Sequence, residues 1–170
     1  TVDGIQRDSQ SLTLNASESQ TITLEWATAD GDAGSYSAVV SSDDDNASTG
    51  VTVQAPAFFE VGSLTSNSPV IGRASLSVDA TITNTGDQPG TQTATLTIDG
   101  IQQDAQSLTL NASESQTITL EWATLDGDAG SYSAVVSSDD DNASTGVTVQ
   151  APAFFEVGSL TSNSPVIGRA

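Results

Sequence analysis

Carboxylates are the side chains through which this chain could do chemistry. Its 170 residues include 22 Asp and Glu against 3 Lys and Arg, which gives a net charge of −19, and they include no His or Cys. A Ser-His-Asp triad, a Cys nucleophile and ordinary zinc, haem or iron–sulfur sites are therefore excluded. Paired carboxylates could hydrolyse glycosides only in a partly desolvated cleft, whereas these occur in turn-like sequence. We expect that the chain is not an enzyme.

The same composition limits the partners of the chain. Phosphate contacts need cationic side chains, so binding to nucleic acid or to an anionic membrane surface is not expected. No apolar run approaches the roughly 18 residues of a transmembrane helix, and no signal peptide precedes Thr1. We therefore expect no membrane insertion in this segment.

Four identical Asn-Ala-Ser triplets match the sequon for N-glycosylation. They begin at Asn15, Asn46, Asn111 and Asn142, all in sequence that we expect to form loops. Chance supplies such triplets often in a chain rich in Ser, Thr and Asn. If the chain is extracellular, we expect N-glycans on at least one site per repeated unit.

The chain repeats itself with a period of 96 residues. Thr1–Ala74 aligns with Thr97–Ala170 without a gap, and four positions differ: Val2/Ile98, Arg7/Gln103, Ser9/Ala105 and Ala29/Leu125. We divide it into the C-terminal part of one unit (1–56), a complete unit (57–152) and the first strand region of the next (153–170). This suggests a section of a longer tandem array. The alternative is a short chain whose ends complete one another across molecules, although those ends lack a counterpart of Ser75–Leu96.

Within the unit, apolar and polar residues alternate with a period of two, and the helical period is absent. The alternating runs lie at 75–83, 94–98, 108–110, 118–122, 132–136 and 147–149, with an opening strand at 155–160 and in its counterpart. Turn-forming residues separate them. We predict an all-β fold of tandem Ig-like antiparallel β-sandwiches, each with about seven strands.

A series of short motifs follows this pattern in order. It comprises Phe59–Gly72 (repeated from Phe155), Asn84-Thr-Gly86, Asp99-Gly100, Trp122 and Gly130-Ser-Tyr132. The series resembles the CARDB family, immunoglobulin-like domains named for cell adhesion and found in bacterial and archaeal surface proteins. The resemblance covers the whole unit. It implies a β-sandwich that serves as an extracellular spacer or adhesive module and has no catalytic residues.

The stretch from Asp128 to Ala134 resembles the Asp-x-Gly-x-Tyr-x-Cys signature of immunoglobulin domains, with Ala in place of the cysteine. That resemblance implies a tyrosine corner, in which the Tyr132 hydroxyl bonds back to the backbone. Asp32 and Tyr36 repeat the motif. A structural role of this kind would remove Asp32 and Asp128 from any metal site.

Asp clusters also supply the oxygen ligands that Ca²⁺ prefers, although no EF-hand pattern is present. The linker between units is short, Gln54–Ala57, and Pro56 stiffens it, so loops of adjacent units should approach one another. We predict a possible Ca²⁺ bridge across the junction, and no other cofactor; its ligands would be Asp30 and Asp32 of one unit and Asp87, Asp139, Asp140 and Asp141 of the next. The simpler alternative for each cluster is a hydrated surface adapted to molar salt.

Two aromatic pairs follow Pro at the unit boundaries, Phe58–Phe59 and Phe154–Phe155. We expect one member of each pair to fill the core and the other to pack between units. A contact site for another subunit is the functional alternative.

Together these features favour a structural role. We predict a rigid rod of Ig-like units in an extracellular filament or cell-surface stalk of a halophilic archaeon, with copies of itself along a fibre as partners. Both copies carry the same loops, which favours repetition for length over recognition. An adhesion or glycan-binding surface module is the alternative. Two further alternatives rank lower: assembly by exchange of strands between units, and an array that spaces an enzyme domain outside this segment.

Overall fold

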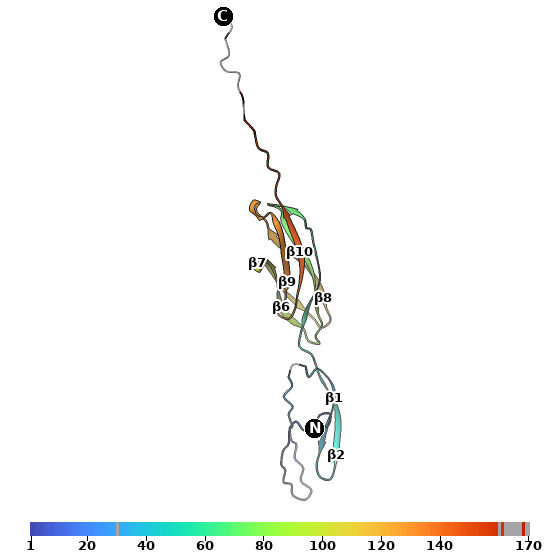
Figure 1. Cartoon of the computed structure of the whole chain (residues 1–170). Coiled ribbons are helices and arrows are strands. Elements are labelled where there is room, and N and C mark those ends of the chain that lie inside the picture. The colour runs from blue at the N-terminus through green and yellow to red at the C-terminus, as the bar shows by residue number, and fades with distance from the viewer. Residues whose placement is uncertain (30, 160, 162–167, 169–170) are drawn as a thin grey trace.

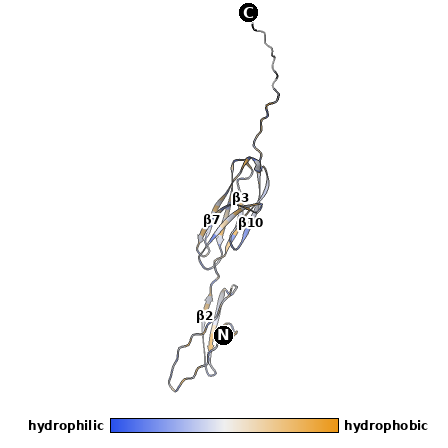
Figure 2. Cartoon of the chain, turned by 90° about the vertical axis from the view of Figure 1, so that its left-hand side faces the viewer, coloured by the Kyte–Doolittle hydropathy of each residue, from blue (hydrophilic) through white to orange (hydrophobic). Residues whose placement is uncertain are grey.

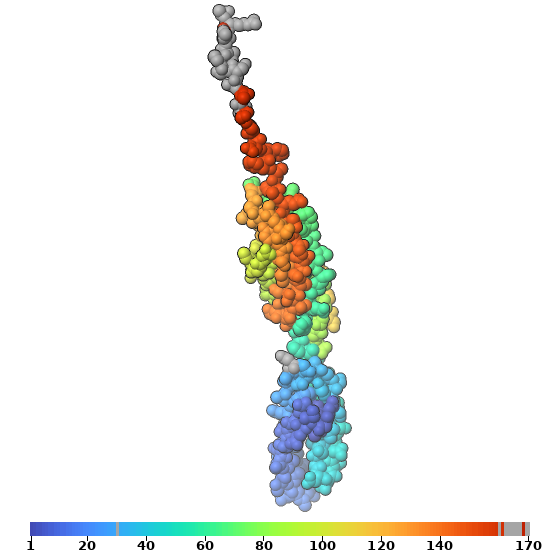
Figure 3. Space-filling model, viewed as in Figure 1, coloured from blue at the N-terminus to red at the C-terminus, as the bar shows by residue number. Residues whose placement is uncertain are grey.

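The computed structural model describes residues 1–29, 31–159, 161 and 168. Its centre is an all-β sandwich built from strands β3 to β10, which confirms the predicted fold class. Figure 1 shows this sandwich between the N-terminal part, which contains a two-stranded hairpin, and an extended segment that follows β10. The space-filling view shows the same end-to-end succession (Figure 3).

Two sheets form the layers of the sandwich. One has the order β3-β5-β8, and its antiparallel strands are Phe59–Ser66, Ser75–Asn84 and Ser115–Ala123. The other has the order β4-β10-β9-β6-β7, with strands Val70–Ile71, Asn142–Gln150, Gly130–Ser137, Gly90–Ile98 and Ile101–Leu110. A 3₁₀ turn, η1 (Asp126–Asp128), connects β8 to β9.

The strand register brings the apolar positions of neighbouring strands onto one face. In the pairing of β5 with β8, Leu76 lies opposite Trp122 and Val78 lies opposite Leu120. A slip of one strand by one residue would turn its apolar row outward, so the period-two pattern specifies the register as well as the strand.

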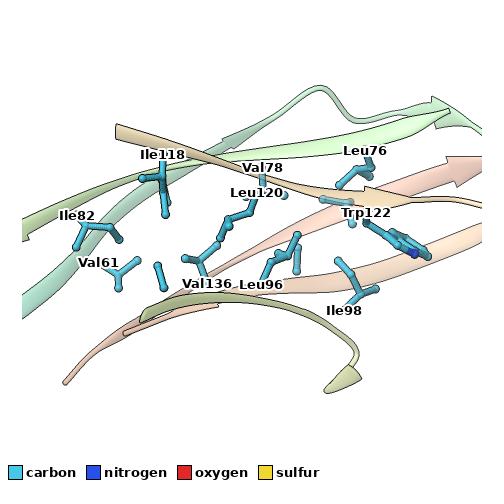
Figure 4. Packing of buried hydrophobic residues seen from close by; sticks show 14 of the residues in the cluster. Val61, Leu76, Val78, Ile82, Leu96, Ile98, Ile118, Leu120, Trp122 and Val136 are labelled. Carbon is cyan, nitrogen blue, oxygen red and sulfur yellow. The ribbon is translucent and has the colours of Figure 1, made fainter. Parts of the chain in front are cut away.

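Side chains from both sheets interdigitate in one core (Figure 4). Leu76, Val78, Ile82 and Leu120 come from the three-stranded sheet, and Leu96 and Val136 from the five-stranded sheet; all are fully buried. At one end of the core, the rings of Trp122 and Tyr132 meet edge to face with centroids 5.1 Å apart. Such a contact stabilises the fold beyond the burial of ring area alone.

Hydroxyl side chains cover the outer faces of the sandwich. Cross-strand pairs link Thr81 to Thr117 at 3.0 Å, Thr83 to Ser115 at 2.9 Å and Thr91 to Thr109 at 2.8 Å. In Figure 2 the strands accordingly carry both hydrophobic and hydrophilic segments. These rows give a solvated surface without lysine.

The structure differs from the predicted strand list in three ways. Residues 155–159 of the opening strand predicted at 155–160 form no strand, and residue 160 lies outside the described residues. Strands β6, β7 and β10 begin several residues earlier than their apolar runs, and β4 is an additional strand. β4 has only two residues, and it forms because Val70 and Ile71 lie parallel to Val149 and Gln150 of β10. A two-residue strand has no periodicity from which it could be predicted.

The N-terminal copy forms fewer strands than the complete unit. Its hairpin consists of β1 (Gly34–Ser41) and β2 (Asn46–Val53). Residues 5–14, which match β7 except at two positions, form no strand. In the complete unit β7 pairs with β6, whose counterpart in this copy is reduced to Thr1 and Val2. The same sequence thus becomes a strand only where its ladder partner is present.

This difference predicts unequal effects of one substitution made at two equivalent positions. Leu120 is fully buried, whereas its counterpart Leu24 is only half-buried. Leu120→Ala should lower the free energy of unfolding by about 2–5 kcal/mol, because it leaves a cavity in a closed core. Leu24→Ala should lower it much less. Urea denaturation followed by circular dichroism checks this, and equal losses for the two variants would contradict it.

Candidate functional site

The loop between β5 and β6, residues 85–89, holds the linker that precedes the sandwich. The backbone N–H of Asp87 donates to the carbonyl of Ala55 at 3.2 Å, and the Asp87 Oδ2 accepts from the N–H of Ala55 at 2.9 Å. The Gln88 side chain also donates to the Gln54 side chain. Both backbone groups of Ala55 are therefore fixed by the following unit.

Two glycines allow the linker to lie this close. A Cβ on Gly86 would stand 1.9 Å from the carbonyl oxygen of Pro56, and a Cβ on Gly90 would stand 2.5 Å from the Ala57 Cβ. Any other residue would push the linker away from the loop.

The buried side chain of Asn84 organises this junction. Its Nδ2 donates to the carbonyls of Gln88, Asn111 and Leu110 at 2.8, 3.1 and 3.3 Å. Its Oδ1 accepts from the N–H groups of Gly86 and Phe58 at 3.0 and 3.2 Å. One carboxamide thus joins the linker, its own loop and the turn between β7 and β8.

The sequence marks Asn84 only as part of the Asn84-Thr-Gly86 motif, with no role assigned to its side chain. The signal that could have identified it is its position in β5, where Leu76, Val78, Ala80 and Ile82 occupy every second residue and Asn84 continues the same buried row. A polar residue at a core-facing position needs internal hydrogen-bond partners, so it marks a site of fixed geometry.

The acidic loop 138–141, between β9 and β10, caps the edge of the sandwich. Asp140 Oδ2 accepts from the N–H of Phe59 at 2.8 Å, and Asp141 Oδ2 accepts from that of Val61 at 3.0 Å. The Ser138 hydroxyl donates to the carbonyl of Phe59 at 2.7 Å. These carboxylates satisfy outward backbone groups of the edge strand β3, and the charge strengthens each bond.

The predicted Ca²⁺ ligands are therefore used in different ways. Asp32 Oδ2 accepts from the N–H of Ala29 at 2.8 Å, while its carbonyl accepts from the Tyr36 hydroxyl at 2.7 Å. Asp87, Asp140 and Asp141 bind backbone N–H groups, and Asp139 donates its own N–H to Gln92. Asp30 lies outside the described residues. Among those described, no group of three or more acidic, His or Cys residues could hold a metal ion. The Ca²⁺ bridge stays a prediction.

The tyrosine corner is present in both copies. The Tyr132 hydroxyl donates to the carbonyl of Asp128 at 2.8 Å, and Tyr36 makes the equivalent bond to Asp32. The turn role implied for these two aspartates is thus confirmed.

A further carboxylate closes the gap between the edges of the two sheets. Asp104 Oδ2, on β7, accepts from the N–H of Glu121, on β8, at 2.9 Å. In the N-terminal copy Asp8 accepts from Glu25 at 3.0 Å and from Ser9 at 2.7 Å. Donation by the Glu25 N–H, and then by that of Ser9, lowers the pKa of Asp8 below the usual value for aspartate.

The four sequon asparagines are all exposed. Asn15 and Asn111 begin tight turns, as expected. Asn46 and Asn142 are the first residues of β2 and β10, so the expectation that their sequons lie in loops is wrong. In the first aromatic pair Phe59 is fully buried, which confirms the expectation for that pair. In the second pair Phe154 and Phe155 are 87% and 89% exposed, so neither fills a core in this structure and the expectation is wrong there. Phe58 is 45% exposed, and its packing between units stays a prediction.

None of the helices in the described part of the chain has the length and apolarity that crossing a membrane requires.

Removal of the Asn84 carboxamide should destabilise the complete unit strongly. Asn84→Ala leaves several buried backbone groups without partners, which should cost on the order of 3 kcal/mol of unfolding free energy. The exposed Asn46→Ala is the matched control and should change it by less than about 0.5 kcal/mol. Thermal and urea unfolding measure both. A stable Asn84→Ala variant would show that the junction does not depend on this side chain.

Asp8 should make the N-terminal copy sensitive to acid. Because its folded pKa lies below its unfolded value, its bonds stabilise the fold above the unfolded pKa and are lost as the pH falls through the folded pKa. An NMR titration of the Asp8 carboxyl carbon should give a midpoint below that of aspartate in a short unstructured peptide. A midpoint at or above the peptide value would contradict the hydrogen bonds to Glu25 and Ser9.

Comparisons with known proteins give one family match and several similar solved structures. The CARDB family model matches residues 58–145, which are 88 of the 170 residues. A CARDB domain of a Pyrococcus furiosus protein, crystallised in complex with di-metal ions, is similar with a TM-score of 0.48 and 14% identity, over 57% of this chain and 94% of that one.

Two β-glucosidases also contain a similar region. The enzyme from Erythrobacter marinus has a TM-score of 0.48 and 20% identity, over 55% of this chain and 15% of that one. The enzyme from Listeria innocua, in complex with glucose, has the same TM-score and 19% identity, over 55% of this chain and 16% of that one. The chain thus spans about a sixth of either glucosidase. No curated protein matches it significantly. Since the family model extends from the end of the linker into β10, the chain belongs to the CARDB family.

Proposed function

We propose that this chain is part of a rigid extracellular rod, in which CARDB units joined end to end act as a spacer in a filament or cell-surface stalk. The observation that carries the proposal is the reciprocal pair of bonds between Asp87 and Ala55, at 3.2 and 2.9 Å. A linker whose backbone is hydrogen-bonded to the next unit cannot act as a free hinge.

Near-identity of the two copies supports a role in building length. Only four of the 74 aligned positions differ, and none of them falls in the loop at 138–141, in the linker at 54–57 or in their counterparts at 42–45 and 150–153. The loop at 84–90 occurs once in this sequence. Repeated units with the same junction residues would repeat one junction geometry. A module selected for recognition would instead be expected to vary its loops between copies.

An adhesion or glycan-binding module is the alternative function. It is compatible with the family, whose members occur in surface and adhesion-related proteins. Electron microscopy of cells that produce the protein would separate the two roles: uniform thin fibres support a rod, and a sugar-binding globular tip supports adhesion.

The proposal also covers a saline habitat, the absence of a catalytic role and the partners of the chain. A net charge of −19 without lysine would keep such a rod hydrated in concentrated salt, as in a halophilic archaeon. We propose no catalytic role, since the carboxylates described above accept hydrogen bonds from backbone groups. Copies of the chain along a fibre would be its partners.

Gly86→Ala tests the rigid junction directly. The added Cβ would clash with the Pro56 carbonyl, so it should release the linker and let the N-terminal part move against the sandwich. Small-angle X-ray scattering should show a broader distribution of interatomic distances and a more flexible Kratky profile than for the wild-type chain.

The matched control is Gly146→Ala in β10, where an added Cβ meets nothing within 4 Å. It should scatter like the wild-type chain. A Gly86→Ala variant that also does so, while circular dichroism shows the sandwich folded, would refute the rigid rod.

A further inference from the structure

We propose that Asn142 and its counterpart Asn46 are the N-glycan acceptors of the folded units, and that Asn111 and Asn15 are not. The inference rests on the proposed extracellular role, and it distinguishes two classes among four sequons that are the same triplet, Asn-Ala-Ser. Because the triplets are identical, any difference between the sites must come from the surrounding fold.

Hydrogen bonds engage the amide of Asn111. Its Nδ2 donates to Glu114 Oε2 at 2.8 Å, its backbone N–H donates to the same oxygen at 2.7 Å, and the Glu114 N–H donates back to the Asn111 carbonyl at 3.1 Å. The nitrogen that would receive the sugar is thus hydrogen-bonded to a carboxylate, and the two backbone bonds close the turn that holds this carboxylate in place.

Asn15 is engaged in the same way. Its Nδ2 and backbone N–H both donate to Glu18 Oε2 at 2.8 Å, and the Glu18 N–H donates to its carbonyl at 3.0 Å. Donation by the backbone N–H of Asn15, and then by its side chain, lowers the pKa of Glu18 below its usual value. The same contact occurs in both copies, including the one in which the neighbouring residues form no strand.

Backbone geometry separates the two classes further. The hydroxyl residue of the engaged sequons has a left-handed backbone, with φ of +61° at Ser113 and +66° at Ser17. Asn142 and Ser144 instead lie two residues apart in β10, where alternate side chains project from one face of a strand. Both are exposed, and within the described part of the chain the Asn142 side chain makes no hydrogen bond.

The reaction needs a free amide. The Asn Nδ2 forms a bond to C1 of a sugar carried on a lipid diphosphate, the bond from C1 to the diphosphate oxygen breaks, and the lipid diphosphate leaves with the electron pair. One amide proton passes to a base of the transferring enzyme. At Asn111 the bonds to Glu114 must first be broken, whereas Asn142 can enter the reaction directly.

A glycan on Asn142 would stand beside the junction. Asn142 directly follows Asp141, whose carboxylate holds the N–H of Val61 near the start of β3. The loop before β10 lies at the end of the sandwich that faces the N-terminal part (Figure 1). Asn46 occupies the equivalent place in the preceding copy.

The test uses the whole chain, made without glycans, folded, and incubated with a purified oligosaccharyltransferase and a lipid-diphosphate oligosaccharide. Peptide mass spectrometry should find Asn142 and Asn46 modified at least about tenfold faster than Asn111 and Asn15. In chain unfolded by pre-treatment, all four sites should react at similar rates. Equal rates at Asn111 and Asn142 in the folded chain would overturn the proposal, as would no reaction at Asn142.

Glu114→Ala provides the matched variant. It should raise the rate at Asn111 several-fold and leave Asn15, with Glu18 intact, unchanged in the same molecule. Glu114→Gln keeps an acceptor oxygen and should leave Asn111 slow. A Glu114→Ala chain that stays folded with Asn111 still unreactive would overturn the role of this contact. Since the assay uses purified protein, its failure leaves the rod proposal standing; a cytoplasmic location of the native protein would overturn the extracellular role instead.

Discussion

The buried carboxamide of Asn84 is the interaction on which the sandwich and its connection to the preceding residues both depend. It ends the core-facing row of β5, where a polar group must find every partner inside the protein. Its partners are all backbone groups, of the linker, of its own loop and of the turn after β7. The geometry therefore depends little on neighbouring side chains, and it restricts the loop mainly at Gly86 and Gly90, where a Cβ would strike the linker.

Carboxylates hold several backbone N–H groups at the edges of this sandwich. Asp140 and Asp141 accept the outward N–H groups of β3, and Asp104 accepts one from β8. Each is a charge-assisted bond to a sheet edge, so it also occupies a backbone donor to which a strand of another molecule could add. The donors offset part of the repulsion between neighbouring aspartates.

The period-two pattern was sufficient to predict the fold class and the position of most strands of the complete unit, because burial on one face makes every second residue apolar. It did not predict where β6, β7 and β10 begin. It could not predict β4, which exists only through its contact with β10. The pattern also could not predict that Asp140 and Asp141 accept backbone N–H groups of β3. A run of three aspartates has the same composition whether it binds a cation or caps a strand, and only the position of the Phe59 and Val61 N–H groups separates the two. The burial of Asn84 could have been predicted, because it continues the row of apolar residues in β5.

The two copies separate local from long-range determinants of this fold. The edge-to-face contact of Trp26 with Tyr36 has centroids 5.0 Å apart, nearly as in the complete unit, because both residues lie within one short stretch of chain. Residues 5–14, in contrast, need a partner strand and remain without one. The sandwich of a unit therefore closes only when its first strands are present. The loop that binds the linker belongs to the unit that follows the linker. In an array of such units, each would close its own core and also orient the unit before it. One set of residues, centred on Asn84 and Asp87, would then determine the direction of every junction.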